Sequence, residues 1–208
     1  MISVIIPVFN GEKYLRAALE SIDFPDVQVI VTDDGSTDSS AQIARDFGAN
    51  VICLPHGGPV IARNAGLGVA TGEYVLFLDS DDVMVSGAIA QMYAQISDND
   101  MIIATRTDFV SPDCTGQYKT TQSQHGAIAG CALIRRKLFD RIGMFDTELM
   151  CGDAYDWLLR ARESGAKIHE ISLVACRRRL HGENMGIKMR GREYADYCKI
   201  IRKHFIKK

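Results

Sequence analysis

Hydrophobic and polar positions alternate with two different periods along the first half of the chain. Short apolar runs of strand length occur at Ile2–Phe9, Val27–Thr32, Val51–Leu54, Tyr74–Leu78 and Met101–Ala104. The segments between these runs are predicted helices, several with apolar residues at helical spacing: Glu12–Ile22, Ser36–Phe47, Pro59–Asn64 and Gly87–Ile96. Strands that alternate with helices are typical of βα units on a parallel sheet. We therefore predict an α/β fold with a mostly parallel central sheet flanked by helices.

The pattern changes near residue 105. Thr105–Gln124 is polar and has no period, so we predict a long loop there. The apolar spacing beyond this loop predicts two more strands and three more helices. The strands are Ala127–Ile134 and Ile168–Val174, and the helices are Arg136–Ile142, Asp153–Ser164 and Glu193–Phe205.

Composition and charge narrow the class of protein. The chain has 208 residues, of which 47% are hydrophobic and 24% charged, the balance of a single soluble domain. A net charge of −2 gives no electrostatic reason to expect a nucleic acid partner. No apolar run approaches the roughly 20 residues of a membrane-spanning helix, and the start lacks the features of a signal peptide, so we expect cytoplasmic residence. The six cysteines form no C-x-x-C pair, which disfavours zinc and redox sites.

Polar residues follow three of the predicted strands. Asn10 follows the first, Asp34 the second, and Asp79, Asp81 and Asp82 the fourth. Ligands of open parallel sheets bind outside the carboxyl ends of the strands, so these residues are candidates for one site. Three carboxylates so close together would repel one another, and oxygen ligands favour Mg²⁺ or Mn²⁺. The alternative is a solvated acidic turn that caps the next helix.

Several segments together resemble the signatures of family 2 glycosyltransferases, in the same order along the chain. The matching segments are Val4–Asn10, Val31–Asp38, Ala62–Gly66, Phe77–Asp82, Gly143–Asp146, Gly152–Arg160 and Arg178–Asn184. The resemblance implies a GT-A fold and transfer of a sugar from a nucleotide diphosphate donor with inversion at the anomeric carbon. The change of pattern near residue 105 suggests how one domain would be divided. Residues 1–104 would bind the nucleotide sugar, residues 105–185 would face the acceptor, and residues 186–208 would form a basic helix.

The resemblance further implies which residues bind the donor. The nucleotide-sugar candidates are Pro7, Phe9, Asn10, Asp34, Arg63, Asp79 and Ser80. Asp34 would accept the N3–H of a uracil ring, which points to a UDP-sugar. Other roles remain open for three of them: Asp34 as a helix cap, Asn10 in an Asx-turn with Gly11, and Arg63 in a surface ion pair.

By the same resemblance, Asp81 and His181 would bind Mn²⁺ or Mg²⁺, which neutralises charge on the departing diphosphate. His181 as a solvated loop residue is the alternative. The general base is expected in the acidic pair that opens the Asp153 helix. The usual second member of that pair is Ala154 here, so the candidates are Asp153 and Asp156. Asp156 stands four residues before Arg160, a spacing that favours an ion pair and a weaker base, so Asp153 is preferred.

Two other functions compete with this interpretation. Asp79 and Asp81 also fit the D-x-D motif of haloacid-dehalogenase-like phosphatases, although that motif normally follows the first core strand and here follows the fourth. Ala154 leaves room for a nucleotide-sugar-binding protein without turnover. A dinucleotide-binding dehydrogenase is excluded because no G-x-G-x-x-G follows the first strand.

The C-terminal segment is basic and amphipathic. From Lys188 to Lys208 it has eight Lys and Arg residues against Glu193 and Asp196. Four large apolar residues recur in its helix: Tyr194, Tyr197, Ile201 and Phe205. Either this stripe packs on the domain, or it lies on an anionic membrane at the inner face, where a lipid-linked acceptor would be found. The expected acceptor is a hydroxyl group of a glycan, a lipid-linked molecule or another acceptor.

Overall fold

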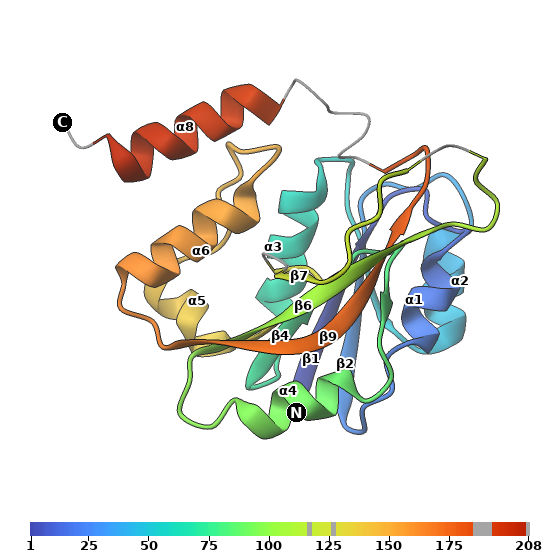
Figure 1. The fold of residues 1–208 in the computed structure, drawn as a ribbon. Helices are drawn as coiled ribbons and strands as arrows, with labels where there is room; N and C mark the ends of the chain where they lie inside the picture. The colour runs from blue at the N-terminus through green and yellow to red at the C-terminus, as the bar shows by residue number, and fades with distance from the viewer. Residues whose placement is uncertain (116–117, 126–127, 185–192, 207–208) are drawn as a thin grey trace.

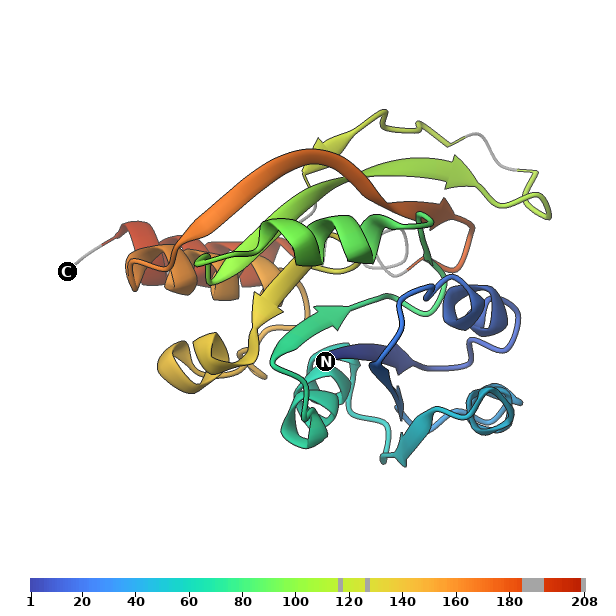
Figure 2. The ribbon, with the colours of Figure 1, turned by 90° about the horizontal axis from the view of Figure 1, so that it is seen from below.

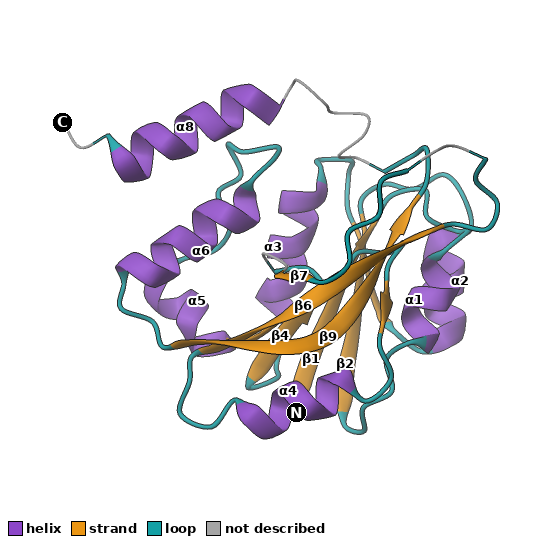
Figure 3. Cartoon of the chain, in the orientation of Figure 1, coloured by secondary structure: helices purple, strands orange, loops and turns teal. Residues whose placement is uncertain are grey.

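The computed structural model describes residues 1–115, 118–125, 128–184 and 193–206. In this part of the chain nine strands form one sheet, in the order β3-β2-β1-β4-β8-β6-β9-β5, with β7 paired to β6. The strands are β1 Ile2–Val8, β2 Val27–Asp33, β3 Asn50–Cys53, β4 Tyr74–Phe77, β5 Val83–Met84, β6 Met101–Val110, β7 Gln124–His125, β8 Ala132–Arg135 and β9 Ile168–Leu180. Helices surround the sheet, which confirms the predicted α/β class (Figure 3).

The first four strands are parallel, as expected for βα units. β1 pairs with β2 on one side and β4 on the other, and β3 extends the sheet beyond β2. The strands after β4 are mixed, because β8 runs antiparallel to both β4 and β6 while β6 and β9 are parallel. The carboxyl ends of β1, β2 and β4 therefore lie at one edge, where ligands of such sheets bind.

Helices cover both faces of the curved sheet (Figures 1 and 2). They are α1 Leu15–Glu20, α2 Ser40–Phe47, α3 Pro59–Val69, α4 Ala88–Gln95, α5 Arg136–Ile142, α6 Asp153–Glu163 and α8 Glu193–Phe205. The alternation of side chains along β1 explains the two layers. Val4 and Ile6 join a core with residues of α1, α2 and α4, whereas Ile5 joins a second core with residues of α3, α5 and α6.

The predicted loop Thr105–Gln124 is partly wrong. Its first six residues belong to β6, which continues to Val110 because β9 pairs with it as far as Leu180. β9 is accordingly six residues longer than the predicted Ile168–Val174. Residues of intermediate burial fill this outer half of β6, so the sequence there lacks the continuous apolar run of a buried strand.

Two helices begin later than their pattern predicts, because the residues before them bond to one another. The backbone N–H of Glu12 donates to Asp38 Oδ2, and the N–H of Ser39 donates to Glu12 Oε2. α1 therefore begins at Leu15 instead of Glu12, and α2 at Ser40 instead of Ser36. The predicted strand Ala127–Ile134 begins at Ala132, and residue 127 lies outside the described residues.

The C-terminal helix α8 forms as predicted, but only part of its apolar stripe packs on the domain: the ring of Tyr197 lies close to Gly152, whereas the other three residues of the stripe point to solvent. Tyr194, Ile201 and Phe205 are exposed, and Ile200 is the large apolar residue of this helix that is buried. Residues 185–192, which include part of the basic segment, lie outside the described residues. None of the helices in the described part of the chain has the length and apolar character needed to cross a membrane.

Candidate active site

A cleft of about 790 Å³ opens beyond the carboxyl ends of β1, β2 and β4. All the residues that were predicted to bind nucleotide sugar or metal line it: Pro7, Phe9, Asn10, Asp34, Arg63, Asp79, Ser80, Asp81 and His181. They come from five separate segments of the chain. The parallel strands β1, β2 and β4 bring three of these segments to one edge of the sheet, α3 adds Arg63, and the pairing of β5 with β9 adds His181. The two base candidates, Asp153 and Asp156, are not in the lining of this cleft as far as the described residues define it.

Asp34 holds the loop that precedes α3. One carboxylate oxygen accepts the N–H of Gly57 at 2.8 Å, and the other accepts the N–H of Gly58 at 2.9 Å. Asp34 does not cap α2, which begins at Ser40 without a side-chain cap. The neighbouring Asp33 accepts the N–H of Ser36 in the turn before that helix. Because each carboxylate oxygen has two acceptor sites, Asp34 retains capacity for a donor in the cleft.

His56 and Phe9 form an aromatic pair at the edge of the cleft. Their ring centroids are 4.1 Å apart with an interplanar angle of 26°. His56 Nδ1 also lies 2.9 Å from Asp34 Oδ2. His56 could not be predicted from the sequence, because nothing near it along the chain distinguishes it from a surface histidine. The pair offers a flat surface on which a planar ring can stack.

Asn10 joins the loops that follow β1 and β2. Its Oδ1 accepts the N–H of Thr37 at 2.9 Å, and its own N–H donates to Ser36 Oγ. Asn10 has φ = 50°, a left-handed conformation that asparagine tolerates better than most residues. The suggested Asx-turn with Gly11 is replaced by these longer-range bonds. The next residue, Gly11, needs its missing side chain, since a Cβ there would lie 2.6 Å from Val8 Cγ2.

Arg63 bridges two carboxylates and is not a surface ion pair. Its Nη2 lies 3.2 Å from Asp79 Oδ1, and its Nη1 lies 2.9 Å from Asp153 Oδ2, while only 13% of its side chain is exposed. The sequence did not predict this ion pair of Asp153 with Arg63. Asp153 Oδ1 forms no hydrogen bond with the residues that the structure describes, so this oxygen can still accept a proton. The Arg63 guanidinium therefore links Asp153 to Asp79 in the cleft lining.

Asp81 and His181 meet on the wall of the cleft. His181 Nε2 lies 2.9 Å from Asp81 Oδ2, and Asn184 Nδ2 donates to the same oxygen at 3.0 Å. Asn184 also accepts the N–H of His181 at 2.7 Å and is buried, which fixes the turn that carries the histidine. The ring of Tyr14 lies 4.8 Å from the His181 ring. The alternative of a solvated loop histidine does not fit, because His181 is buried.

These residues fit a hard divalent cation in part. A carboxylate and an imidazole converge at Asp81 and His181, and such ions commonly take few protein ligands together with water and phosphate oxygens. Among the described residues no group of three or more His, Cys, Asp or Glu side chains is arranged around one point. The protein would thus supply two ligands, and a bound diphosphate would have to supply others.

Asp82 lies beside Asp81 in the lining of the same cleft. Its Oδ1 accepts the N–H of Arg179 at 2.8 Å, so it joins the loop to β9 and does not cap a turn. Burial raises its pKa well above the usual range, and the nearby Asp81 and Asp79 raise it further. The cluster is therefore electrostatically strained when all carboxylates are ionised, as expected for a site that receives positive charge from a ligand.

Three consecutive arginines near the end of β9 divide between the two faces of the strand. Arg177 and Arg179 lie over the ring of Phe109, each 4.7 Å from its centroid. Arg178 points to the other face and lines the cleft. Side chains alternate between the two faces of a strand, so Arg178 could have been predicted to face away from Arg177 and Arg179. The predicted strand, however, ended at Val174, before these residues.

Asp156 forms ion pairs away from the cleft. Its side chain is fully buried and lies 2.9 Å from each of three groups, on Arg160, Lys203 and His204. Burial opposes its ionisation, but the hydrogen bonds from His204, Lys203 and Arg160 outweigh this and lower the pKa of Asp156. The predicted ion pair with Arg160 is present. Asp156 joins α6 to α8, which gives it a structural task.

Comparison with known proteins identifies relatives of one kind. The model of the family described as glycosyl transferase family 2 matches residues 3–123. Glycosyltransferase GlyG of Streptococcus pneumoniae is 37% identical over 109 residues, which are 48% of this chain and 36% of GlyG. Minor teichoic acid biosynthesis protein GgaA of Bacillus subtilis is 35% identical over 134 residues, which are 57% of this chain and 30% of GgaA.

The fold is also similar to that of a solved structure. The crystal structure of S. aureus TarS 1-349 in complex with UDP superposes with a TM-score of 0.73 at 25% identity, and covers 97% of this chain and 63% of that one. The expected GT-A fold and the resemblance to family 2 are confirmed by these matches. The chain spans about a third of each of the two curated relatives and less than two thirds of the TarS chain.

Proposed function

The chain belongs to glycosyl transferase family 2, and from this membership we propose that it transfers a monosaccharide from a UDP-sugar to a hydroxyl group of an acceptor. The observation that carries the proposal is the cleft of about 790 Å³ lined by residues from five segments. Its volume suits a nucleotide sugar, since small-molecule sites commonly measure about 300 to 1,000 Å³.

Two features of the cleft support uridine as the base. Asp34 is a carboxylate in the wall and would accept the N3–H of a uracil ring, a charge-assisted hydrogen bond. Phe9 and His56 form the flat pair beside it, on which the ring would stack. TarS, which superposes on nearly the whole chain, is described in complex with UDP.

A divalent cation, Mn²⁺ or Mg²⁺, would be held by Asp81 and His181. Such an ion supplies Lewis-acid stabilisation of the departing diphosphate. Arg178, which lines the same wall, would bind the diphosphate as a second positive charge. Asp79, fixed by Arg63, would accept hydrogen bonds from hydroxyl groups of the sugar or ribose.

Asp153 would act as the general base. The acceptor oxygen forms a bond to the anomeric carbon, the bond from that carbon to the diphosphate breaks, and the electron pair leaves with the diphosphate. The acceptor proton passes to Asp153 Oδ1, the oxygen that Arg63 does not use. Attack from the face opposite the diphosphate inverts the anomeric carbon. GgaA is described as a teichoic acid biosynthesis protein, which supports a cell-surface glycan or its lipid-linked precursor as the acceptor.

One observation favours a second candidate function, the binding of a nucleotide sugar without turnover. Ala154 cannot accept a proton, and Arg63 occupies one oxygen of Asp153. Binding and turnover are therefore to be measured separately.

The test is a thermal-shift and calorimetric screen of nucleoside diphosphate sugars with and without Mn²⁺, followed by assay of nucleotide release. A ligand at about a hundred times its dissociation constant raises the free energy of unfolding by about 2.7 kcal/mol. The proposal expects UDP-sugars to stabilise the protein more than GDP-sugars, and Mn²⁺ to increase the effect. Binding without UDP release in the presence of a panel of acceptors would support the second candidate, and stabilisation by neither class of sugar would contradict both.

A further inference from the structure

The outer side of α8 presents large apolar side chains to solvent. Tyr194 is 74% exposed, Ile201 50% and Phe205 68%, and Ile206 just beyond the helix is 60% exposed. On a helix Tyr194, Ile201 and Phe205 fall along one stripe, because their spacings of seven and four residues return to the same side. We call these three residues the outer stripe. Scattered single apolar residues are ordinary on a surface, but a row of three on one helix face is not.

The docking of α8 does not depend on this stripe. The helix is held by its opposite side, where Asp196 Oδ2 accepts the N–H groups of Met150 and Cys151 at 2.9 and 3.1 Å. Lys199 donates to the carbonyl of Glu148, and Lys203 lies 2.9 Å from Asp156 Oδ1. His204 bridges Asp156 and Glu163. The inner side of α8 is thus fixed by polar contacts together with the buried Ile200, while Tyr194, Ile201 and Phe205 take no part in the docking.

Gly152 shows how closely the inner side of α8 packs on the domain. A Cβ at Gly152 would lie 2.8 Å from Ile200 Cδ1, so the loop before α6 and the buried side of α8 are in close contact. The helix therefore cannot simply rotate to bury its outer stripe without losing the bonds of Asp196 and His204. The outward direction of the stripe is built into the packing.

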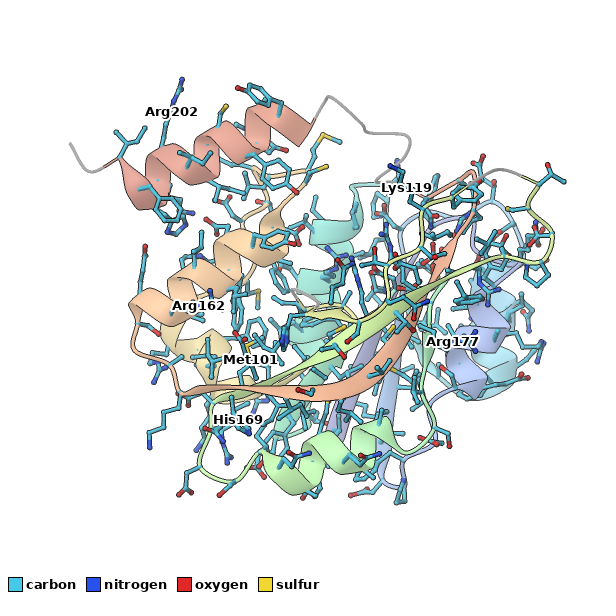
Figure 4. All side chains as sticks on the ribbon, in the orientation of Figure 1. Met101, Lys119, Arg162, His169, Arg177 and Arg202 are labelled. Atoms are coloured by element: carbon cyan, nitrogen blue, oxygen red, sulfur yellow. The ribbon has the colours of Figure 1, made fainter. Side chains whose placement is uncertain are left out.

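We propose that the outer stripe of α8 binds the surface of an anionic lipid bilayer. The charge of the segment supports this occupant, because residues 188–208 contain eight Lys and Arg against two acids. Three of the eight, Lys199, Arg202 and Lys203, lie in the described part of the helix, and of these Lys199 and Lys203 pair with carboxylates. Arg202 extends from α8 away from the body of the molecule (Figure 4). Apolar side chains flanked by basic ones are typical of a helix that lies in the membrane interface.

The position of α8 relates the lipid contact to the cleft. The helix lies at the same end of the molecule as the carboxyl ends of β1 and β2, beyond which the cleft opens (Figure 1). A bilayer bound to α8 would therefore be near the side from which an acceptor reaches the cleft. This last step rests on the proposed function, whereas the lipid contact itself does not.

The proposal is tested by co-sedimentation of the full chain with vesicles of phosphatidylcholine, alone or mixed with phosphatidylglycerol, at low and high salt. We expect binding to the mixed vesicles at low salt, and a loss of most of it at high salt or with phosphatidylcholine alone. The double variant Ile201→Ser/Phe205→Ser should bind at least about tenfold more weakly. The control is Phe47→Ser/Val69→Ser, which removes two exposed apolar residues from α2 and α3 and should bind like the parent.

Absence of binding to the mixed vesicles at low salt, or equal binding of the parent and the double variant, would overturn the proposal. A parent dimer that the double variant loses, without vesicle binding, would also overturn it and assign the stripe to a second copy of the chain. UDP binding and the midpoint of urea unfolding, measured on every variant, show that each is folded. Because UDP affinity is measured independently, failure of the lipid contact is distinguishable from failure of the proposed donor site.

Discussion

His181 Nε2 lies 2.9 Å from Asp81 Oδ2, although 100 residues separate the two in the sequence. His181 directly follows β9, and Asp81 lies in the turn between β4 and β5. β5 pairs with β9 in antiparallel register, with Val83 opposite Arg177, and this pairing brings the turn to the histidine. A two-residue strand that the hydrophobic pattern did not predict thus assembles the candidate cation site.

We predict that Asp81 couples UDP binding to the cation. Asp81→Asn keeps the shape of the side chain but removes its charge, so the gain in UDP affinity on adding Mn²⁺ should shrink by more than tenfold, about 2 kcal/mol. Calorimetric titration with UDP, with and without Mn²⁺, measures it. Asp98→Asn, at an exposed position outside the cleft, is the control. An equal Mn²⁺ effect in Asp81→Asn and the parent would remove Asp81 from the cation site.

Arg178 should recognise the diphosphate and not the nucleoside. Its neighbours Arg177 and Arg179 are engaged with Phe109, whereas Arg178 lines the cleft. Loss of a charge-assisted contact costs about 2 kcal/mol, so Arg178→Gln should weaken UDP binding by a factor of about 30 and leave uridine binding nearly unchanged. Arg177→Gln serves as the control. A parallel loss of uridine and UDP affinity would mean that Arg178 supports the base pocket or the fold instead.

The family and the fold class could be predicted because their signals are local. The βα alternation of the first half and the order of the matching segments depend on residues close together in sequence. The extension of β6 to Val110 could not be predicted, since that half of the strand is stabilised by pairing with β9 and not by its own apolar run. The sequence also could not predict that the outer stripe of α8 faces solvent, because periodicity gives the spacing of a stripe and not what it faces.

The residues of the candidate site that lie in local sequence motifs could be predicted from the sequence. The nine nucleotide-sugar and metal candidates line one cleft, but their roles stay predictions until binding and turnover are measured. His56 and Asn184 were missed because their importance arises from distant partners: Asp34 and Phe9 for His56, and Asp81 for Asn184. Such pairings join segments more than twenty residues apart, and no pattern in one sequence reveals them.

The docking of α8 should weaken as pH rises. Burial lowers the pKa of His204, but its hydrogen bonds to Asp156 and Glu163 outweigh this and raise the pKa above the usual 6.5. A pKa raised by folding contributes stability that is complete below the unfolded value and is lost as pH rises through the folded value. The charged groups around His204 are Asp156 and Glu163 on α6, with Lys203 and Arg160 also bonded to Asp156.

Urea unfolding at several pH values between about 5 and 9 tests this pH dependence. The free energy of unfolding of the parent should fall more across this window than that of His204→Gln, which can still form a hydrogen bond but does not titrate. His169→Gln, at an exposed position on β9, should behave like the parent. If His204→Gln and the parent lose stability equally, the protonated His204 does not hold α8.

Asp153 and Asp156 stand one helical turn apart on α6, and the structure separates their tasks. Asp153→Asn can still accept the hydrogen bond from Arg63 through its amide oxygen, so the neighbourhood of the cleft should keep its shape. It cannot accept a proton, so turnover should fall on the order of a hundredfold or more while UDP and Mn²⁺ binding are retained. Steady-state assay of UDP release, together with calorimetry, measures the two effects.

Asp156→Asn is the matched variant on the same helix, and it should have the opposite effect. It leaves Arg160, Lys203 and His204 around a buried neutral side chain, so the free energy of unfolding should fall by about 3 kcal/mol. Turnover per folded molecule should stay within a few-fold of the parent, because Asp156 is fully buried and its oxygens are bonded to Arg160, Lys203 and His204. Turnover of Asp153→Asn close to that of the parent, or its abolition in a folded Asp156→Asn protein, would assign the general base to a residue other than Asp153.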